Sequence, residues 1–148
     1  MEQVTVRFAK LDARAQVPTY GTAYAAGADL RAVCDGEITI ASGETVLVHT
    51  GIAVEIPEGL VGLIYARSGL ASKRGLAPAN CVGVIDSDYR GELMVALHNH
   101  SKAPQVIEHG ERIAQFVLAP YICAVFTETD SLTDTDRGAG GFGSTGTK

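Results

Sequence analysis

Short apolar segments separated by glycine and turn residues run through most of this sequence. Residues 45–48 lead through Gly51 into residues 52–56, and a Pro-Glu-Gly turn follows. Because β-branched residues are common in these segments, they favour strands over buried helices. The pattern predicts an all-β protein, and leaves open a sandwich, a jelly roll or a barrel. The other segments of this kind are residues 4–8, 37–40, 60–65, 81–85, 93–98, 113–118 and 123–127.

One segment, residues 68–75, departs from this pattern. It begins with Ser68, a residue type that often caps a helix N-terminus. Gly75 follows Lys73 and Arg74, as at a typical helix end. The sequence therefore predicts one short helix, with Ser68 as its N-cap.

Composition and charge narrow the classes of protein to which this chain can belong. Hydrophobic residues make up 46% and charged residues 20% of the chain, as in a typical soluble domain. No apolar run reaches the roughly 18 residues that a membrane span needs. The net charge of −5 argues against binding to nucleic acid or to anionic membranes. The N-terminal residues lack a signal-peptide pattern, so we expect a cytoplasmic protein that binds neither nucleic acid nor membrane.

The cysteines and histidines do not suggest a disulfide framework or a zinc site. Cys34, Cys81 and Cys123 are odd in number and far apart, so we expect three buried thiols that behave as small hydrophobic residues. His98 and His100 would share one face of a strand, but no third ligand is spaced to join them.

The composition changes near residue 130, where a polar, acidic segment leads into a glycine-rich one. We therefore expect two parts, a domain at residues 1–129 and a flexible C-terminal arm at residues 130–148. Phe142 is a lone aromatic residue in the arm. The glycine-flanked Ser144 and Thr145 could turn hydroxyl and backbone N–H groups toward an anion, so the arm could fold over a phosphate ligand.

Arginines and aspartates beside small or apolar residues are the candidates for chemistry. Arg67, Arg112 and Arg137 lie beside small polar residues, and a guanidinium group suits phosphate oxygens. Three such sites in an acidic protein suggest a local positive pocket. Asp29 and Asp86 lie beside apolar segments, and each is a candidate general base or metal partner. We expect Asp86 to be partly buried.

Five segments combine these candidate residues with small or apolar neighbours, at residues 26–30, 66–71, 83–91, 110–115 and 137–146. They resemble the five motifs of the trimeric dUTPase family, come in the family's order and extend over nearly the whole chain. Ala66 is a small departure, because many members have proline or glycine there, and we expect it to alter a turn rather than the chemistry.

This resemblance implies an enzyme, a dUTP diphosphatase that hydrolyses dUTP to dUMP and pyrophosphate with Mg²⁺. Such a reaction lowers dUTP and supplies dUMP for thymidylate synthesis. The implied fold is a jelly-roll-like β-barrel. The implied assembly is a homotrimer whose active sites are shared between subunits, with each arm closing over one site.

The resemblance also implies the roles of the residues at the reacting phosphate. Asp86 would be the general base that activates water for attack on the α-phosphate. Ser68 would act on the α–β bridge, and Gln115 would contact the phosphates. Asp29 would hold Mg²⁺ through a metal-bound water. The role of Arg112 stays open between a phosphate contact and a structural ion pair.

The remaining contacts implied by the resemblance surround the nucleotide. A hairpin at residues 80–89 would bind the uracil edge, and Tyr89 would pack on the deoxyribose and exclude a 2′-hydroxyl. Phe142 would stack on the uracil, while Arg137 would bind the γ-phosphate from the arm. Besides Ser68, Asp86 and Gln115, the substrate contacts are then Arg67, Gly69, Asn80, Gly83, Val84, Ile85, Tyr89, Arg137, Phe142, Gly143, Ser144 and Thr145.

Three alternative functions are weaker explanations of the same residues. A dCTP deaminase would need a glutamate beside the base hairpin, and none is apparent. A catalytically silent nucleotide-binding member of the fold would not need Asp86, Tyr89 and the arm together. A generic β-sandwich binding module would leave the arginines, the aspartates and the arm unexplained.

Overall fold

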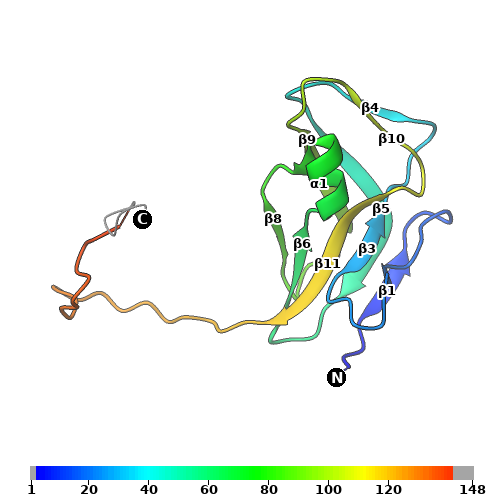
Figure 1. The fold of residues 1–148 in the computed structure, drawn as a ribbon. Helices are drawn as coiled ribbons and strands as arrows, with labels where there is room; N and C mark the ends of the chain where they lie inside the picture. The colour runs from blue at the N-terminus through cyan, green and yellow to red at the C-terminus, as the bar shows by residue number, and fades with distance from the viewer. Residues whose placement is uncertain (1–2, 142–148) are drawn as a thin grey trace.

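The computed structural model describes residues 3–141, which form three antiparallel sheets and one helix (Figure 1). The four-stranded sheet has the order β1-β5-β9-β7, with bounds Arg7–Lys10, Thr45–Glu55, Glu92–Asn99 and Leu76–Pro78. The five-stranded sheet has the order β2-β3-β11-β6-β8, with bounds Thr19–Tyr20, Ala28–Arg31, Arg112–Pro120, Leu60–Tyr65 and Val82–Ile85. A two-stranded sheet pairs β10, Gln105–Ile107, with β4, Ile38–Ile40. The helix α1 is Ser68–Arg74.

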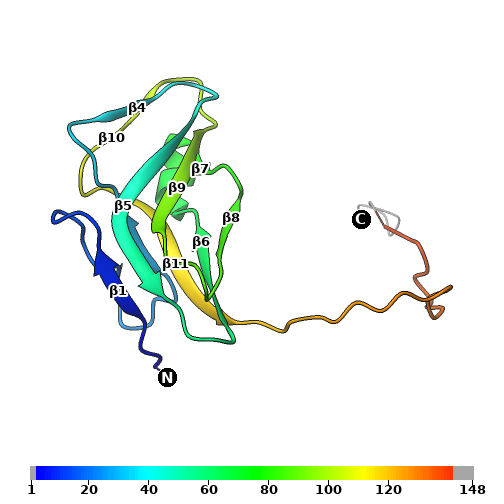
Figure 2. The same ribbon diagram turned by 180° about the vertical axis from the view of Figure 1, so that it is seen from behind.

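The two larger sheets lie on opposite sides of one apolar core (Figures 1 and 2). β9 contributes every second side chain to this core: Leu93, Val95 and Leu97 are buried, and the residues between them are not. Leu30 of β3 and Ile64 of β6 enter the same core from the other sheet. The predicted all-β fold with one short helix is therefore confirmed. No helix in the part of the chain that the structure describes is long and apolar enough to span a membrane.

Most of the predicted strands are found, and one is wrong. The long segment at residues 45–56 is β5, and residues 60–65 are β6. Residues 123–127 are exposed and have no strand partner among residues 3–141, although their sequence is apolar. The cysteine prediction is also wrong, because Cys81 and Cys123 are exposed and Cys34 is only half-buried.

The helix lies where the sequence predicts it, but its N-cap differs. Arg67 has extended backbone angles and is the N-cap, without a side-chain capping bond, so Ser68 is the first helical residue. The amide of Ala71 donates to the Arg67 carbonyl, which fixes this boundary. Gly75 ends the helix with a φ of 67°, the left-handed conformation that glycine adopts without strain.

The chain leaves the barrel where β11 ends at Pro120 (Figures 1 and 2). Residues 121–141 lead away from the two sheets, and residues 121–139 are all exposed. The assignment of residues 1–129 to a catalytic domain and residues 130–148 to a closing arm stays a prediction.

We predict that Gly62→Ala destabilises the barrel by overpacking its core. A Cβ atom at Gly62 would lie 2.5 Å from Phe116 Cε2 and 2.9 Å from Ile56 Cδ1. Overpacking of this kind costs about 1–3 kcal/mol of unfolding free energy. Thermal unfolding measures it, with Gly21→Ala as the control because nothing lies within 4 Å of a Cβ there. Equal melting temperatures for the two variants would contradict this packing.

Candidate active site

A buried carboxylate holds two arginines at one end of the five-stranded sheet. Asp29 lies on β3 with 6% of its side chain exposed, and its Oδ1 accepts from Arg67 Nε at 2.9 Å. Its Oδ2 accepts from Arg112 Nη1 at 3.1 Å, and Arg112 is 45% exposed. The open question about Arg112 is therefore answered in part, because it forms an ion pair with Asp29. We call Asp29, Arg67 and Arg112 the arginine–carboxylate cluster.

Gln115 and Ser68 lie close to this cluster. Strand pairing places Gln115 of β11 beside Asp29 on one side and Tyr65 on the other. A Cβ on Gly27 would lie only 3.1 Å from Gln115 Cβ, so this glycine makes room for the Gln115 side chain. Ser68 and Gly69 are exposed at the start of α1, directly after Arg67. The predicted phosphate contacts of the barrel are thus brought together.

A separate pocket lies at the turn between β8 and β9. β8 pairs with β6, and β9 pairs with β5 and β7, so the hairpin predicted at residues 80–89 is instead one strand followed by a turn. We keep the name hairpin pocket for the hollow at this turn. It has a volume of about 270 Å³, and Asp86 and Tyr89 line it together with apolar side chains. Asp86 is exposed, so the prediction that it is partly buried is wrong; it follows the last residue of β8 and enters a turn. The other lining residues are Leu47, Val84, Ile85, Glu92 and Met94.

Asn80 and Gly83 lie at the other end of β8. The Asn80 Nδ2 atom is 3.6 Å from the position of a Cβ on Gly83. Gly83 is buried and Asn80 is exposed. The amide of Asn80 is therefore adjacent to β8 and can present its donors and acceptor at the surface.

The hairpin pocket and the arginine–carboxylate cluster do not meet within one chain. β8 pairs with β6 so that Val82 is level with Tyr65 and Ile85 is level with Gly62. Asp86 follows the end of β8 and Arg67 follows the end of β6, so the two residues lie at opposite ends of this strand pair. The strand between Gly62 and Tyr65 alone covers about 10 Å, too far for one α-phosphate to touch both groups.

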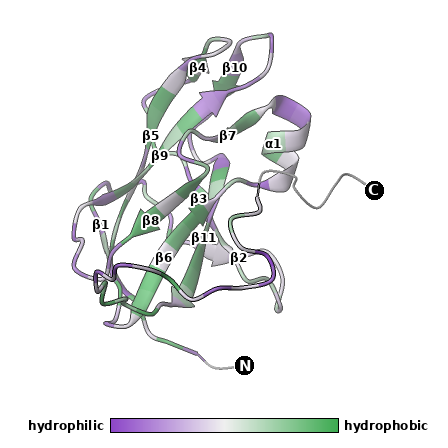
Figure 3. Cartoon of the chain, turned by 90° about the vertical axis from the view of Figure 1, so that its left-hand side faces the viewer, coloured by the Kyte–Doolittle hydropathy of each residue, from purple (hydrophilic) through white to green (hydrophobic). Residues whose placement is uncertain are grey.

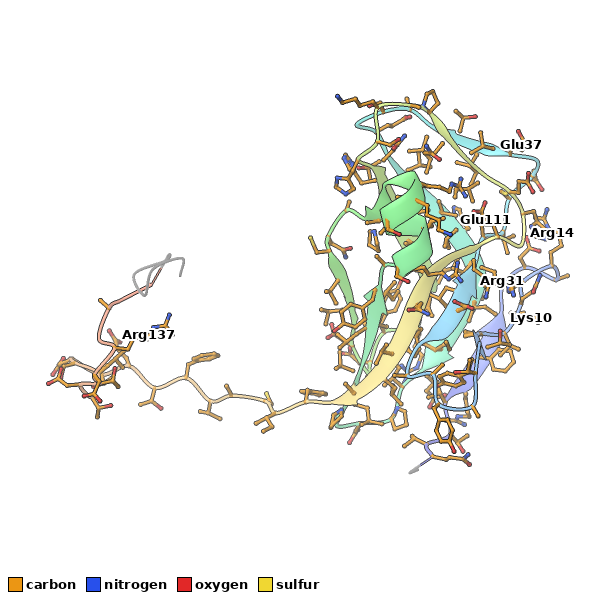
Figure 4. All side chains as sticks on the ribbon, viewed as in Figure 1. Lys10, Arg14, Arg31, Glu37, Glu111 and Arg137 are labelled. Carbon is orange, nitrogen blue, oxygen red and sulfur yellow. The ribbon has the colours of Figure 1, made fainter. Side chains whose placement is uncertain are left out.

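The predicted arm residues lie apart from both groups or outside the described range. Figure 4 shows Arg137 on the arm, far from Arg31 and Glu111 on the barrel. The Nε of Arg137 donates to the Gly140 carbonyl at 2.8 Å, within the arm itself. Phe142, Gly143, Ser144 and Thr145 lie outside the residues that the structure describes.

A second hollow on the barrel carries charged side chains that pair with one another. This hollow, of about 390 Å³, is lined by Asp12, Arg14 and Asp35 among others. Arg14 donates to both carboxylates and holds the pKa of Asp12 at about 2. His49 bonds to Glu92 at its other side. Because these charges pair with one another, the hairpin pocket is the better candidate for a ligand.

Comparison with known proteins decides the family. The dUTPase family model matches residues 13–146. This chain belongs to the dUTPase family. The deoxyuridine 5′-triphosphate nucleotidohydrolase of Desulfitobacterium hafniense is 50% identical over 145 residues, which are 97% of this chain and 96% of that protein. The predicted family is therefore confirmed.

Solved dUTPase structures have the same fold. The dUTPase of Staphylococcus bacteriophage 80alpha with dUPNHPP aligns with a TM-score of 0.85 and 27% identity, covering 98% of this chain and 100% of that chain. A variant dUTPase from phage phi11 of S. aureus, described with a structural Mg(II) ion, aligns with a TM-score of 0.79 and 24% identity over 88% of this chain and 100% of that chain. The dUTPase fold predicted from the motifs is confirmed.

Glu92 is a residue of this site that the sequence analysis missed. It lines the hairpin pocket, and its carboxylate accepts from the backbone amides of Thr50 at 3.1 Å and Gly51 at 2.7 Å. Thr50 and Gly51 lie 42 and 41 positions before Glu92 in the sequence. The one available signal was its place directly after the third dUTPase-like motif, which ends at residue 91.

We predict that Asp29→Asn lowers thermal stability even without metal. The substitution removes the charge that both arginines share, and a buried group left without its charged partner costs about 1–3 kcal/mol. Melting in EDTA measures this, with the exposed Asp88→Asn as the matched control. An unchanged melting temperature in EDTA would mean that Asp29 does not hold the arginines in solution.

Proposed function

We propose that this chain hydrolyses dUTP to dUMP and pyrophosphate as a dUTP diphosphatase. The observation that carries the proposal is the hairpin pocket, which places the exposed carboxylate of Asp86 beside Tyr89 and apolar walls in a member of the dUTPase family. A mostly apolar pocket with a few polar groups of this kind suits a base and a sugar. The cytoplasmic location expected from the sequence stays a prediction.

Asp86 is the proposed general base. It accepts a proton from a water whose oxygen forms a new bond to the α-phosphorus, while the α–β bridging bond breaks and pyrophosphate leaves. A free aspartate, with a pKa near 3.9, is a weak base at neutral pH. Placement of the water therefore supplies much of the rate, and general base catalysis contributes typically about 10²–10⁴-fold.

The arginine–carboxylate cluster is the proposed phosphate site. Asp29 holds Arg67, only 23% of whose side chain is exposed, in one orientation. Ser68, Gly69 and Gln115 lie beside it, so hydroxyl, backbone and amide donors can join the guanidinium on phosphate oxygens. Ser68 would act at the α–β bridge, and Arg137 of an arm would bind the γ-phosphate.

The donor set fits a magnesium ion that is held mainly by the nucleotide. Mg²⁺ is usually bound through one or two carboxylates together with substrate phosphates. Among residues 3–141, no three His, Cys, Asp or Glu side chains come together as a metal site. Each Asp29 oxygen accepts one arginine N–H bond, and its further lone pair can accept from a metal-bound water. When bound, the ion would neutralise charge on the phosphates.

Base recognition is proposed for the hairpin. Backbone groups of Gly83, Val84 and Ile85, with the Asn80 amide, would bind the uracil edge, and cytosine would leave such groups unpaired. Phe142 of an arm would stack on the uracil, and Gly143, Ser144 and Thr145 would follow it onto the phosphates.

We propose a homotrimer with shared sites, as the family resemblance implies, and the separation of the two groups supports it. The hairpin of one subunit and the cluster of another can meet where neither subunit alone brings them together. The segment that follows β11 supports assembly too, because Ile122 and Phe126 are 96% and 94% exposed. Apolar residues of β6 and β8, visible in Figure 3, also line a hollow of about 570 Å³ next to Tyr121.

The first test of the function is a panel of nucleotides. We expect rapid release of pyrophosphate from dUTP, much slower release from dTTP, dCTP and UTP, and loss of release in EDTA. The hairpin accounts for the selectivity, and the nucleotide-bound ion accounts for the effect of EDTA. Ammonia release from dCTP would reassign the chain to deamination, and no release from any nucleotide by the folded protein would reject the proposal.

Mixed trimers test whether the sites are shared. Asp86→Asn and Gln115→Ala should each abolish most activity, because each removes one half of the site. When the two variants are unfolded and refolded together, about a quarter of the sites should combine two intact halves. Each variant refolded alone is the control. Failure of the mixture to regain activity would mean that each site belongs to one subunit.

A further inference from the structure

The Tyr89 ring lies directly against the backbone of Gly91. A Cβ atom at Gly91 would be 2.3 Å from Tyr89 Oη, 2.5 Å from Cζ and 2.9 Å from Cε2. Real Cβ contacts are not this short, and the obstructing atoms belong to a stiff ring rather than to a flexible chain. Tyr89 can therefore occupy this place only because residue 91 is glycine.

The far end of the ring is anchored as well. Tyr89 Oη donates to the main-chain carbonyl of Glu92 at 3.0 Å. Glu92 is itself fixed, because its Oε1 accepts from the amides of Thr50 and Gly51, and its Oε2 bonds to His49 Nδ1 at 2.8 Å. Gly51 has a φ of 66° and lies where the β5–β9 register shifts. Hydrogen bonds thus fix the first residue of β9, Glu92, against the part of β5 where the register shifts. The Tyr89 hydroxyl in turn is hydrogen-bonded to Glu92.

The near end of the ring is held by the turn that carries it. The amide of Tyr89 donates to the Asp86 carbonyl at 3.2 Å. Arg90 Nη1 donates to the carbonyls of Ser87 and Tyr89 at 2.7 and 2.9 Å. Asp86 and Tyr89 therefore belong to one hydrogen-bonded turn. The Tyr89 ring is restrained by this turn at its backbone and by the Glu92 carbonyl at its hydroxyl group.

We propose that Gly91 is a positioning residue that sets the sugar selectivity of the site through Tyr89. This inference rests on the proposed function, in which Tyr89 packs on the deoxyribose. A methyl group at residue 91 would push the ring off its place and break its bond to Glu92. The Tyr89 ring, which would exclude a 2′-hydroxyl, would then no longer lie at a fixed distance from the sugar. UTP would therefore compete with dUTP for the site.

The test is a double-mutant cycle in which the measured quantity is the selectivity for dUTP over UTP. The ratio of kcat/KM for dUTP to kcat/KM for UTP is measured for the wild type, Gly91→Ala, Tyr89→Ala and the double variant. We expect Gly91→Ala to lower this ratio by about tenfold or more, within the range of a lost shape contact. In the Tyr89→Ala background, Gly91→Ala should lower it no further, because its effect passes through the ring.

Gly21→Ala is the matched control, since it adds the same methyl group in open space. A thermal melt of each variant separates selectivity from loss of folded protein. An unchanged ratio in folded Gly91→Ala, or equal effects of this substitution with and without Tyr89, would overturn the inference. A wild type that releases no pyrophosphate from dUTP would reject the proposed function instead. A crystal structure of Gly91→Ala with the ring in its present place would reject the positioning role regardless of activity.

Discussion

The antiparallel register between β6 and β8 is the constraint on which the functional arrangement depends. It places Val82 beside Tyr65 and Ile85 beside Gly62, so the carboxylate of the hairpin and the arginines of the cluster emerge at opposite ends. Bringing them together within one chain would require breaking a pairing that also buries Gly62 and Ile64. In the proposed trimer, contact between copies would remove this conflict, and quaternary structure would be part of the geometry of catalysis.

Much of the fold could be predicted from the sequence because long strands carry a clear pattern. β5, β6, β9 and β11 are six to eleven residues long and rich in apolar residues. β2, β7 and β10 have only two or three residues, too few for a periodic signal. Residues 123–127 have a strand-like composition, but composition does not say whether the partner strand lies in the same chain.

The sequence motifs name candidate residues for the site but do not predict how these residues are arranged. The motifs indicated Asp29, Arg67 and Gln115, but the bonds from Asp29 to Arg67 and Arg112 join positions 38 and 83 apart. Nothing local to any of these residues encodes such a pairing. The exposure of Asp86 could not be predicted either, because an apolar strand before a residue says nothing about whether the following turn is covered.

The exposed segment at residues 121–127, which follows β11, has a consequence for the proposed assembly. It contains no charged side chain, and Val125 is 91% exposed. Uncharged, apolar segments of high strand propensity are typical nuclei of aggregation. A subunit separated from the partners of the proposed trimer would expose such a segment. Separated subunits would then aggregate in competition with reassembly, so activity lost in this way would not return fully on concentration.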